Sequence, residues 1–137
     1  MKYIAITLAV ILVLLLVAFV VGGKYASYSK YDPWEDVQRW RVENNKQPYI
    51  KSQVLCELAD SRTYQLEKNW SHKGFAEGNA NIREFTTFSE NLTMDTAKSD
   101  VLTAWLNSKP HKEVLESERT FGCLVCKSKF CVLELAK

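Results

Sequence analysis

The sequence has only two histidines, His72 and His111, and it contains none of the short motifs that usually mark an active site. It has no G-x-S-x-G nucleophile elbow, no H-E-x-x-H zinc motif and no glycine-rich phosphate loop. It also has no run of basic residues, and its 18 Lys and Arg against 16 Asp and Glu give a formal net charge of +2. These absences exclude the common hydrolase, metalloprotease and nucleotide-binding signatures, and nothing indicates a nucleic-acid partner.

One long stretch has no charged residue at all. It runs from Tyr3 to Val21 and, at about 1.5 Å per residue, reaches the thickness of a bilayer core. The sequence therefore predicts a membrane segment over residues 1–23 and a linker over 24–33. An uncleaved anchor is favoured, because the apolar run is longer than the roughly 7–15 residues of a signal peptide, but a cleaved signal remains an alternative.

Four cysteines follow this segment, an even number that favours disulfides. The stretch TFGCLVCKSKFCVLEL predicts a β-hairpin, and a four-residue loop at 127–130 would place Cys126 opposite Cys131. Strand alternation turns Cys123 to the other face, where it is free to pair with Cys56 on a predicted helix. A zinc site formed by the four thiolates is the alternative.

Disulfides also predict where the domain lies. They form outside the cytoplasm, whereas the lysines that flank the apolar segment do not decide its orientation. We therefore expect residues 3–21 to contact the membrane, the N-terminus to lie inside and the folded domain to be extracytoplasmic. Secretion after signal cleavage is the alternative.

The rest of the chain, 34–137, has the pattern of one α+β domain. Apolar residues recur at helical spacing in three stretches that are separated by turn residues. Helices are expected at 34–45, 52–69 and 96–108, a helical turn at 111–117 and an irregular segment at 70–93. Lys109-Pro110 is expected to end the third helix. Helices come first and paired strands last, which indicates a layered α+β fold.

Three polar residues are the candidates for chemistry: His72 in SHKGF, Glu90 in SENL and His111 in SKPH. Two imidazoles and a carboxylate that meet in a cleft can hold a divalent cation or transfer protons near neutral pH. The alternative is structural, with Glu90 and Asn91 hydrogen-bonding the 70–93 segment to the helices.

The order of these motifs resembles a known family. The stretches RWRVENN, LCELADSRTYQL, SHKGF, SENL, WLNSKPH and FGCLVCKSKFCVLEL follow one another from Trp34 to the C-terminus. In this order they are similar to the CAP superfamily, the SCP-like domain of cysteine-rich secretory proteins, antigen 5 and pathogenesis-related proteins. The resemblance is to its short, exported bacterial members.

This resemblance implies a CAP-type α-β-α sandwich with a cleft lined by two histidines and two acidic residues. His72, Glu90 and His111 match three of these positions, and Ser108 stands at the second acidic one. The missing carboxylate weakens any acid/base pair and lowers the affinity expected for a cation.

Three functions follow as hypotheses. The first is a binding module without enzymatic activity that presents this cleft to an extracytoplasmic lipid, glycan or protein. The second is a metal-dependent, protease-like hydrolase in which His72 and His111 bind Zn²⁺ or another divalent cation, and Glu90 is a ligand or general base. The third is a structural surface protein. The loss of the acidic residue at Ser108 favours binding over catalysis.

Overall fold

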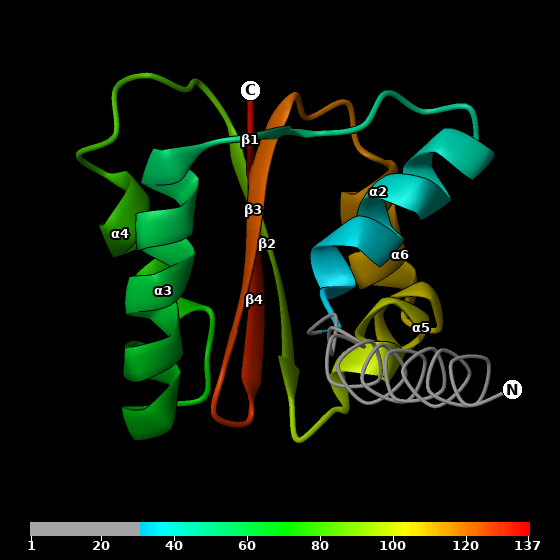
Figure 1. The fold of residues 1–137 in the computed structure, drawn as a ribbon. Helices are drawn as coiled ribbons and strands as arrows, with labels where there is room; N and C mark the ends of the chain where they lie inside the picture. Colours follow the sequence, from blue (N-terminus) through cyan, green and yellow to red (C-terminus); the bar gives the residue numbers. More distant parts are fainter. Residues whose placement is uncertain (1–30) are drawn as a thin grey trace, which may run out of the picture. The chain divides into compact units, whose positions relative to one another are not determined.

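The computed structural model describes residues 31–137, where a four-stranded sheet lies between two layers of helices (Figure 1). The strand order is β1-β3-β4-β2, with β1 parallel to β3 and the other neighbours antiparallel. The strands are β1 (Ile50–Lys51), β2 (Phe88–Met94), β3 (Phe121–Lys127) and β4 (Phe130–Ala136). The expected α-β-α sandwich is observed.

The predicted membrane segment at 1–23, and the linker as far as residue 30, lie outside the described residues. From Tyr31 to Lys137 the chain forms one compact unit. None of the helices in this unit has both the length and the apolar character that crossing a bilayer requires.

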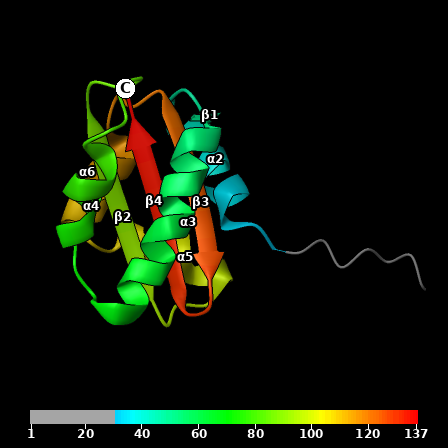
Figure 2. The ribbon, with the colours of Figure 1, turned by 90° about the vertical axis from the view of Figure 1, so that its left-hand side faces the viewer.

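The helices divide between the two faces of the sheet (Figures 1 and 2). One layer holds α3 (Gln53–Lys68) and α4 (Lys73–Asn79). The other holds α2 (Pro33–Glu43), the 3₁₀ turn η1 (Lys98–Asp100), α5 (Val101–Leu106) and α6 (Lys109–Glu116). The two longest begin at side-chain caps, because Asp32 Oδ1 accepts from the Trp34 amide and Ser52 Oγ from the Leu55 amide.

Trp105 anchors the second layer to the sheet. Its side chain is fully buried, and its indole Nε1 donates to the Leu92 carbonyl of β2 at 3.1 Å. It packs with Val37 of α2 and Leu133 of β4 in one apolar cluster. Trp105 therefore belongs to the core that joins the second layer to the sheet.

Two expectations about local structure were wrong. Residues 70–93 were expected to be irregular, but they contain α4 and most of β2, which pairs with β4 along its whole length. β2 was not predicted because polar residues on both of its faces break the alternation of apolar and polar residues that indicates a strand. Lys109-Pro110 does not end a helix but begins α6, since proline lacks an N–H that the first turn leaves unpaired anyway.

Both predicted disulfides, Cys126–Cys131 and Cys56–Cys123, are present, so the alternative four-cysteine zinc site does not form. Cys126 faces Cys131 in the hairpin as expected. The loop between β3 and β4 has two residues rather than four, with Ser128 at a left-handed φ of 52°. The first bridge lies on the α5 and α6 side of the sheet, and the second ties α3 to β3.

We expect the two bridges to stabilise the fold unequally. They join residues 67 and 5 positions apart, so loop-closure entropy predicts losses of about 4 and about 2 kcal/mol when the longer and the shorter bridge are removed. Urea unfolding of a Cys56→Ala/Cys123→Ala variant and a Cys126→Ala/Cys131→Ala variant measures both. An equal or larger loss for the short hairpin bridge would contradict this prediction.

Candidate functional site

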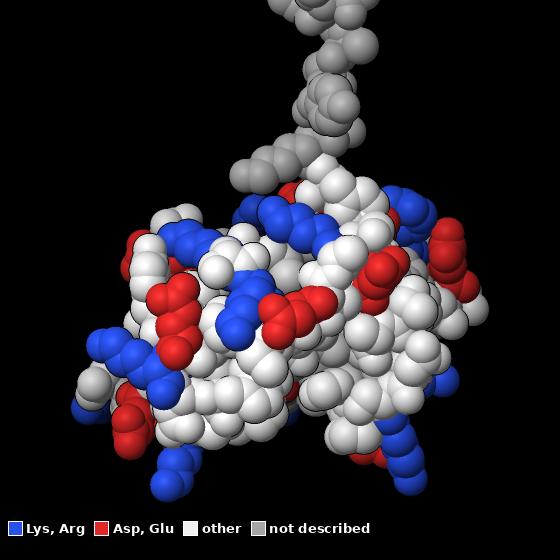
Figure 3. All heavy atoms as spheres, turned by 90° about the horizontal axis from the view of Figure 1, so that it is seen from below, with Lys and Arg blue, Asp and Glu red and all other residues white. Residues whose placement is uncertain are grey.

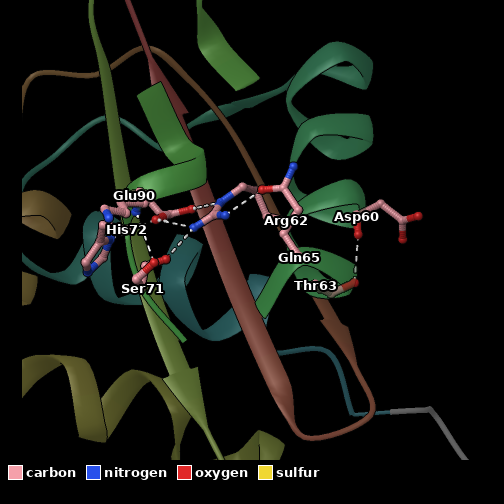
Figure 4. Close-up of polar contacts among 8 residues, drawn as sticks. Asp60, Arg62, Thr63, Gln65, Ser71, His72 and Glu90 are labelled. Atoms are coloured by element: carbon pink, nitrogen blue, oxygen red, sulfur yellow. Dashed lines mark hydrogen bonds and ion pairs between the residues drawn. The ribbon is translucent and has the colours of Figure 1, made fainter. Parts of the chain in front are cut away.

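His72 and Glu90 are in direct contact at the free edge of the sheet. His72 immediately precedes α4, and Glu90 lies near the start of β2. The Nδ1 atom of His72 is 2.7 Å from Glu90 Oε1 (Figure 4). A carboxylate only accepts hydrogen bonds, so the Nδ1–H of His72 donates in this contact and Nε2 is the ring nitrogen that Glu90 does not engage. The His72 side chain is 59% exposed, which leaves Nε2 within reach of a ligand.

Arg62 of α3 holds the same carboxylate from the other side. Its Nε donates to Glu90 Oε2 at 2.7 Å and its Nη2 to Oε1 at 3.2 Å. Both side chains are only 1% exposed. The guanidinium also donates to Gln65 Oε1 and to the Ser71 carbonyl (Figure 4). Both oxygens of Glu90 are therefore engaged by Arg62, and one of them also by His72.

Asn91, the next residue of β2, is hydrogen-bonded to the backbone of the second histidine, His111. Successive strand residues point to opposite faces, so Asn91 faces α6. Its Nδ2 donates to the His111 carbonyl at 2.9 Å. Ser108 lies one turn before His111 as the N-terminal capping residue of α6, although its hydroxyl makes no capping hydrogen bond. The expected structural role of Glu90 and Asn91, tying this segment to the helices, is observed.

The two imidazoles are close enough to interact electrostatically. Partial burial lowers the pKa of His111, and the positive charge of His72 lowers it further. Both effects favour the neutral form of His111, which is the form that a ligand of a metal ion or an acceptor of a hydrogen bond needs. The structure thus brings His72, Glu90 and His111 to one edge of the sheet.

A second carboxyl group, Glu134, lies beside this site. It is the cross-strand neighbour of Glu90 on β4 and has no exposed surface. Neither of its carboxyl oxygens has a hydrogen-bond partner among the described residues. Burial raises its pKa well above the usual value, and the negative charge of Glu90 raises it further, while Arg62 opposes this. Glu134 is therefore a fully buried carboxyl group whose environment favours its protonated form.

Sequence reasoning missed both Arg62 and Glu134, although each carried a signal. Arg62 continues the apolar stripe of α3 that includes Leu55, Ala59 and Leu66. Glu134 lies on a strand whose residues are all buried. A charged residue at a position where only apolar ones are expected predicts a buried partner of opposite charge or a shifted pKa.

The site fits a divalent cation only in part. Within residues 31–137 no three His, Cys, Asp or Glu side chains are arranged to hold a metal ion. Both oxygens of Glu90 accept hydrogen bonds from Arg62, so the nitrogen ligands available to a metal ion are His72 Nε2 and the His111 ring. Two imidazoles need further ligands from water or substrate to complete the coordination of zinc.

These features define an α-β-α sandwich with two histidines held at the edge of its sheet, and known exported proteins share the fold. An outer surface protein of Borrelia burgdorferi superposes with a TM-score of 0.67 at 20% identity, covering 76% of this chain and 88% of that protein. A cysteine-rich secretory protein of Staphylococcus aureus gives 0.68 at 15% identity, covering 76% of this chain and 37% of that one. An extracellular SCP-domain protein of Bacillus anthracis gives 0.67 at 18%, covering 77% and 39%.

The chain therefore shares its fold with these secretory and SCP-domain proteins, and this is the CAP-type fold that the sequence motifs indicated. It spans less than half the length of the staphylococcal and Bacillus proteins but most of the Borrelia one. No family model and no curated protein matches the sequence itself. At these identities the likeness concerns the fold, and function has to be argued from the site.

Removing one partner of the buried ion pair is expected to destabilise the protein strongly. Arg62→Met leaves Glu90 buried without a counter-charge, which costs about 3–5 kcal/mol. Arg62→Met with Glu90→Leu removes both charges and should recover much of the loss. Lys109→Ala, in an exposed ion pair of α6, is the control and should cost under about 1 kcal/mol. Urea unfolding tests this, and equal losses for Arg62→Met and the control would contradict it.

Glu134→Gln should change how stability depends on pH. The pKa of Glu134 is higher in the native state than in the unfolded state, where it is near 4.5. The contribution of this shift to the free energy of unfolding is therefore complete below pH 4.5 and is lost as the pH rises toward the native pKa. As the pH rises across that window, the free energy of unfolding of the variant should increase relative to that of the wild type by up to about 1.4 kcal/mol per pH unit. Urea unfolding from pH 4 to 8 measures the difference, with exposed Glu118→Gln as control. Parallel curves for wild type and Glu134→Gln would refute the prediction.

Proposed function

We infer that this chain is an exported CAP-type binding module, and that His72, His111 and Ser108 contact an extracytoplasmic ligand. The observation that carries this proposal is the state of Glu90, whose two oxygens are engaged by Arg62 and His72. A carboxylate held in this way positions a histidine and is not free to take a proton from a substrate. The loss of the second acid at Ser108 points in the same direction.

The location of the module rests on separate observations. Two disulfides close the fold, and the similar proteins are described as secretory, extracellular or outer-surface. An extracytoplasmic location follows, with attachment through residues 3–21 or release after cleavage as its two forms. Basic and acidic side chains are interspersed over the face in Figure 3, so that face favours no strongly charged ligand.

The second candidate is a divalent-metal-dependent hydrolase, and one contact favours it. A carboxylate that accepts from one imidazole nitrogen leaves the other nitrogen basic and oriented, an arrangement common behind zinc-binding histidines. His72 Nε2 and His111 would hold the ion, which when bound supplies Lewis acidity and an acidified water. Glu90 would orient His72 and offset part of the positive charge.

A zinc titration of the full-length protein separates the two functions. For the binding module we expect weak zinc binding, with dissociation constants above about 0.1 mM that differ less than twofold among wild type, His72→Ala and His111→Ala. Micromolar binding that weakens more than tenfold in each variant would instead establish the metal site. Isothermal titration calorimetry measures these constants, and Lys112→Ala on the exposed side of α6 serves as the control.

The binding function needs its own readout. Wild type and a His72→Ala/His111→Ala double variant would be compared on panels of lipid vesicles, glycans and bacterial surface proteins. At least one probe should bind the wild type and lose tenfold or more in affinity with the double variant. If every probe binds both proteins equally, the two histidines do not contact a ligand and the proposal is wrong.

A further inference from the structure

A groove on the opposite side of the molecule from β2 is not used by the proposed function. It has a volume of about 630 Å³ and lies between the outer side of α3 and the adjoining part of β3. Figure 2 shows α3 running along β3 and β4. The lining residues are Gln53, Cys56, Glu57, Asp60, Ser61, Tyr64 and Val125.

The groove borders an open sheet edge. β1 pairs with β3 only at Phe121 and Gly122, and the Ser52 amide then donates to the Gly122 carbonyl. C-terminal to Gly122, no strand within residues 31–137 pairs with the edge of β3 that faces away from β4. An edge of this kind offers main-chain donors and acceptors to another strand.

The register shows which groups point outward. In a two-residue hairpin the closing pair, Lys127 and Phe130, is hydrogen-bonded, and pairs alternate from there. Leu124 and Cys126 are then in non-hydrogen-bonded pairs, so their N–H and C=O groups point away from β4. The Cα separation of 4.1 Å between Cys126 and Cys131 fits such a pair. Gly122, two residues before Leu124, already uses its outward carbonyl.

The wall of the groove is suited to an ammonium group. Lys127 forms an ion pair with Asp60, and its Nζ lies 5.0 Å from the centre of the Tyr64 ring. Tyr64 is 56% exposed, so a second cation has access to the aromatic ring. Glu57, one turn before Asp60, is exposed and adds a further negative charge.

We propose that this groove docks an extended, lysine-containing peptide segment of a protein partner, which adds as a strand to the edge of β3 at Leu124 to Cys126. The main chain of the peptide pairs with the outward groups of β3, and its lysines approach Glu57 and Tyr64. A second copy of this chain is disfavoured as occupant, because it would present the same acidic Glu57 wall and, in β3, no lysine beyond Lys127, which Asp60 already engages.

The test is fluorescence anisotropy of the labelled peptide acetyl-(Lys-Val)₄-amide with the full-length protein at fixed salt. We expect Glu57→Lys to weaken binding at least fivefold. Glu43→Lys, the same charge change at the end of α2, should change it less than twofold, and so should His72→Ala. The peptide methylated on every amide nitrogen should lose at least tenfold, because it keeps its charge but cannot donate main-chain hydrogen bonds.

Several results would overturn the proposal. Absence of binding at millimolar protein, or equal affinity for acetyl-(Glu-Val)₄-amide, would exclude a site for cationic peptides. Undiminished binding of the methylated peptide would exclude strand addition, and loss of binding with His72→Ala would place the peptide at the histidine site instead. A concentration-dependent dimer in sedimentation, altered by Glu57→Lys, would assign the groove to a second copy of the chain.

Discussion

The buried ion pair between Arg62 and Glu90 is the interaction on which the geometry of the candidate site depends. It joins α3 to the edge strand β2 with both side chains almost completely removed from water. Burying two charges is costly unless their hydrogen-bonding groups are satisfied. Here the guanidinium also binds Gln65 and the Ser71 carbonyl, and that carbonyl fixes the backbone directly before His72.

A glycine makes this arrangement possible. A Cβ atom at Gly74, in the first turn of α4, would overlap Gln65 Oε1 and Arg62 Nη1. A side chain at this position would force the ends of the Gln65 and Arg62 side chains to shift, whereas glycine lets α4 pack directly on them. The glycine of SHKGF therefore has a structural reason: it lets α4 close over the ion pair while His72, two residues earlier, stays at the surface.

The sequence predicted the parts of the fold that depend on local patterns, and it missed the parts that depend on tertiary contacts. The helices that begin after Asp32 and Ser52 were predicted because apolar residues at helical spacing are a local signal, and the disulfides because hairpin register is set by alternation. β2 was missed because Glu90 and Asn91 are polar yet buried on opposite faces of the strand. Their burial makes sense only once Arg62 and His111 are known to lie opposite them.

Glu134 completes the physical argument for binding over catalysis. The family pattern implies two acids in the cleft, and the position expected to supply the second holds Ser108. The structure does contain a second carboxyl group beside Glu90, but it is fully buried, and this burial raises its pKa well above the usual value. Because Glu90 is paired with Arg62 and Glu134 is buried, the binding function that we propose relies on two imidazoles and a hydroxyl. Such a set can recognise a ligand by hydrogen bonds, whereas hydrolysis would need a bound metal ion to supply the activated water.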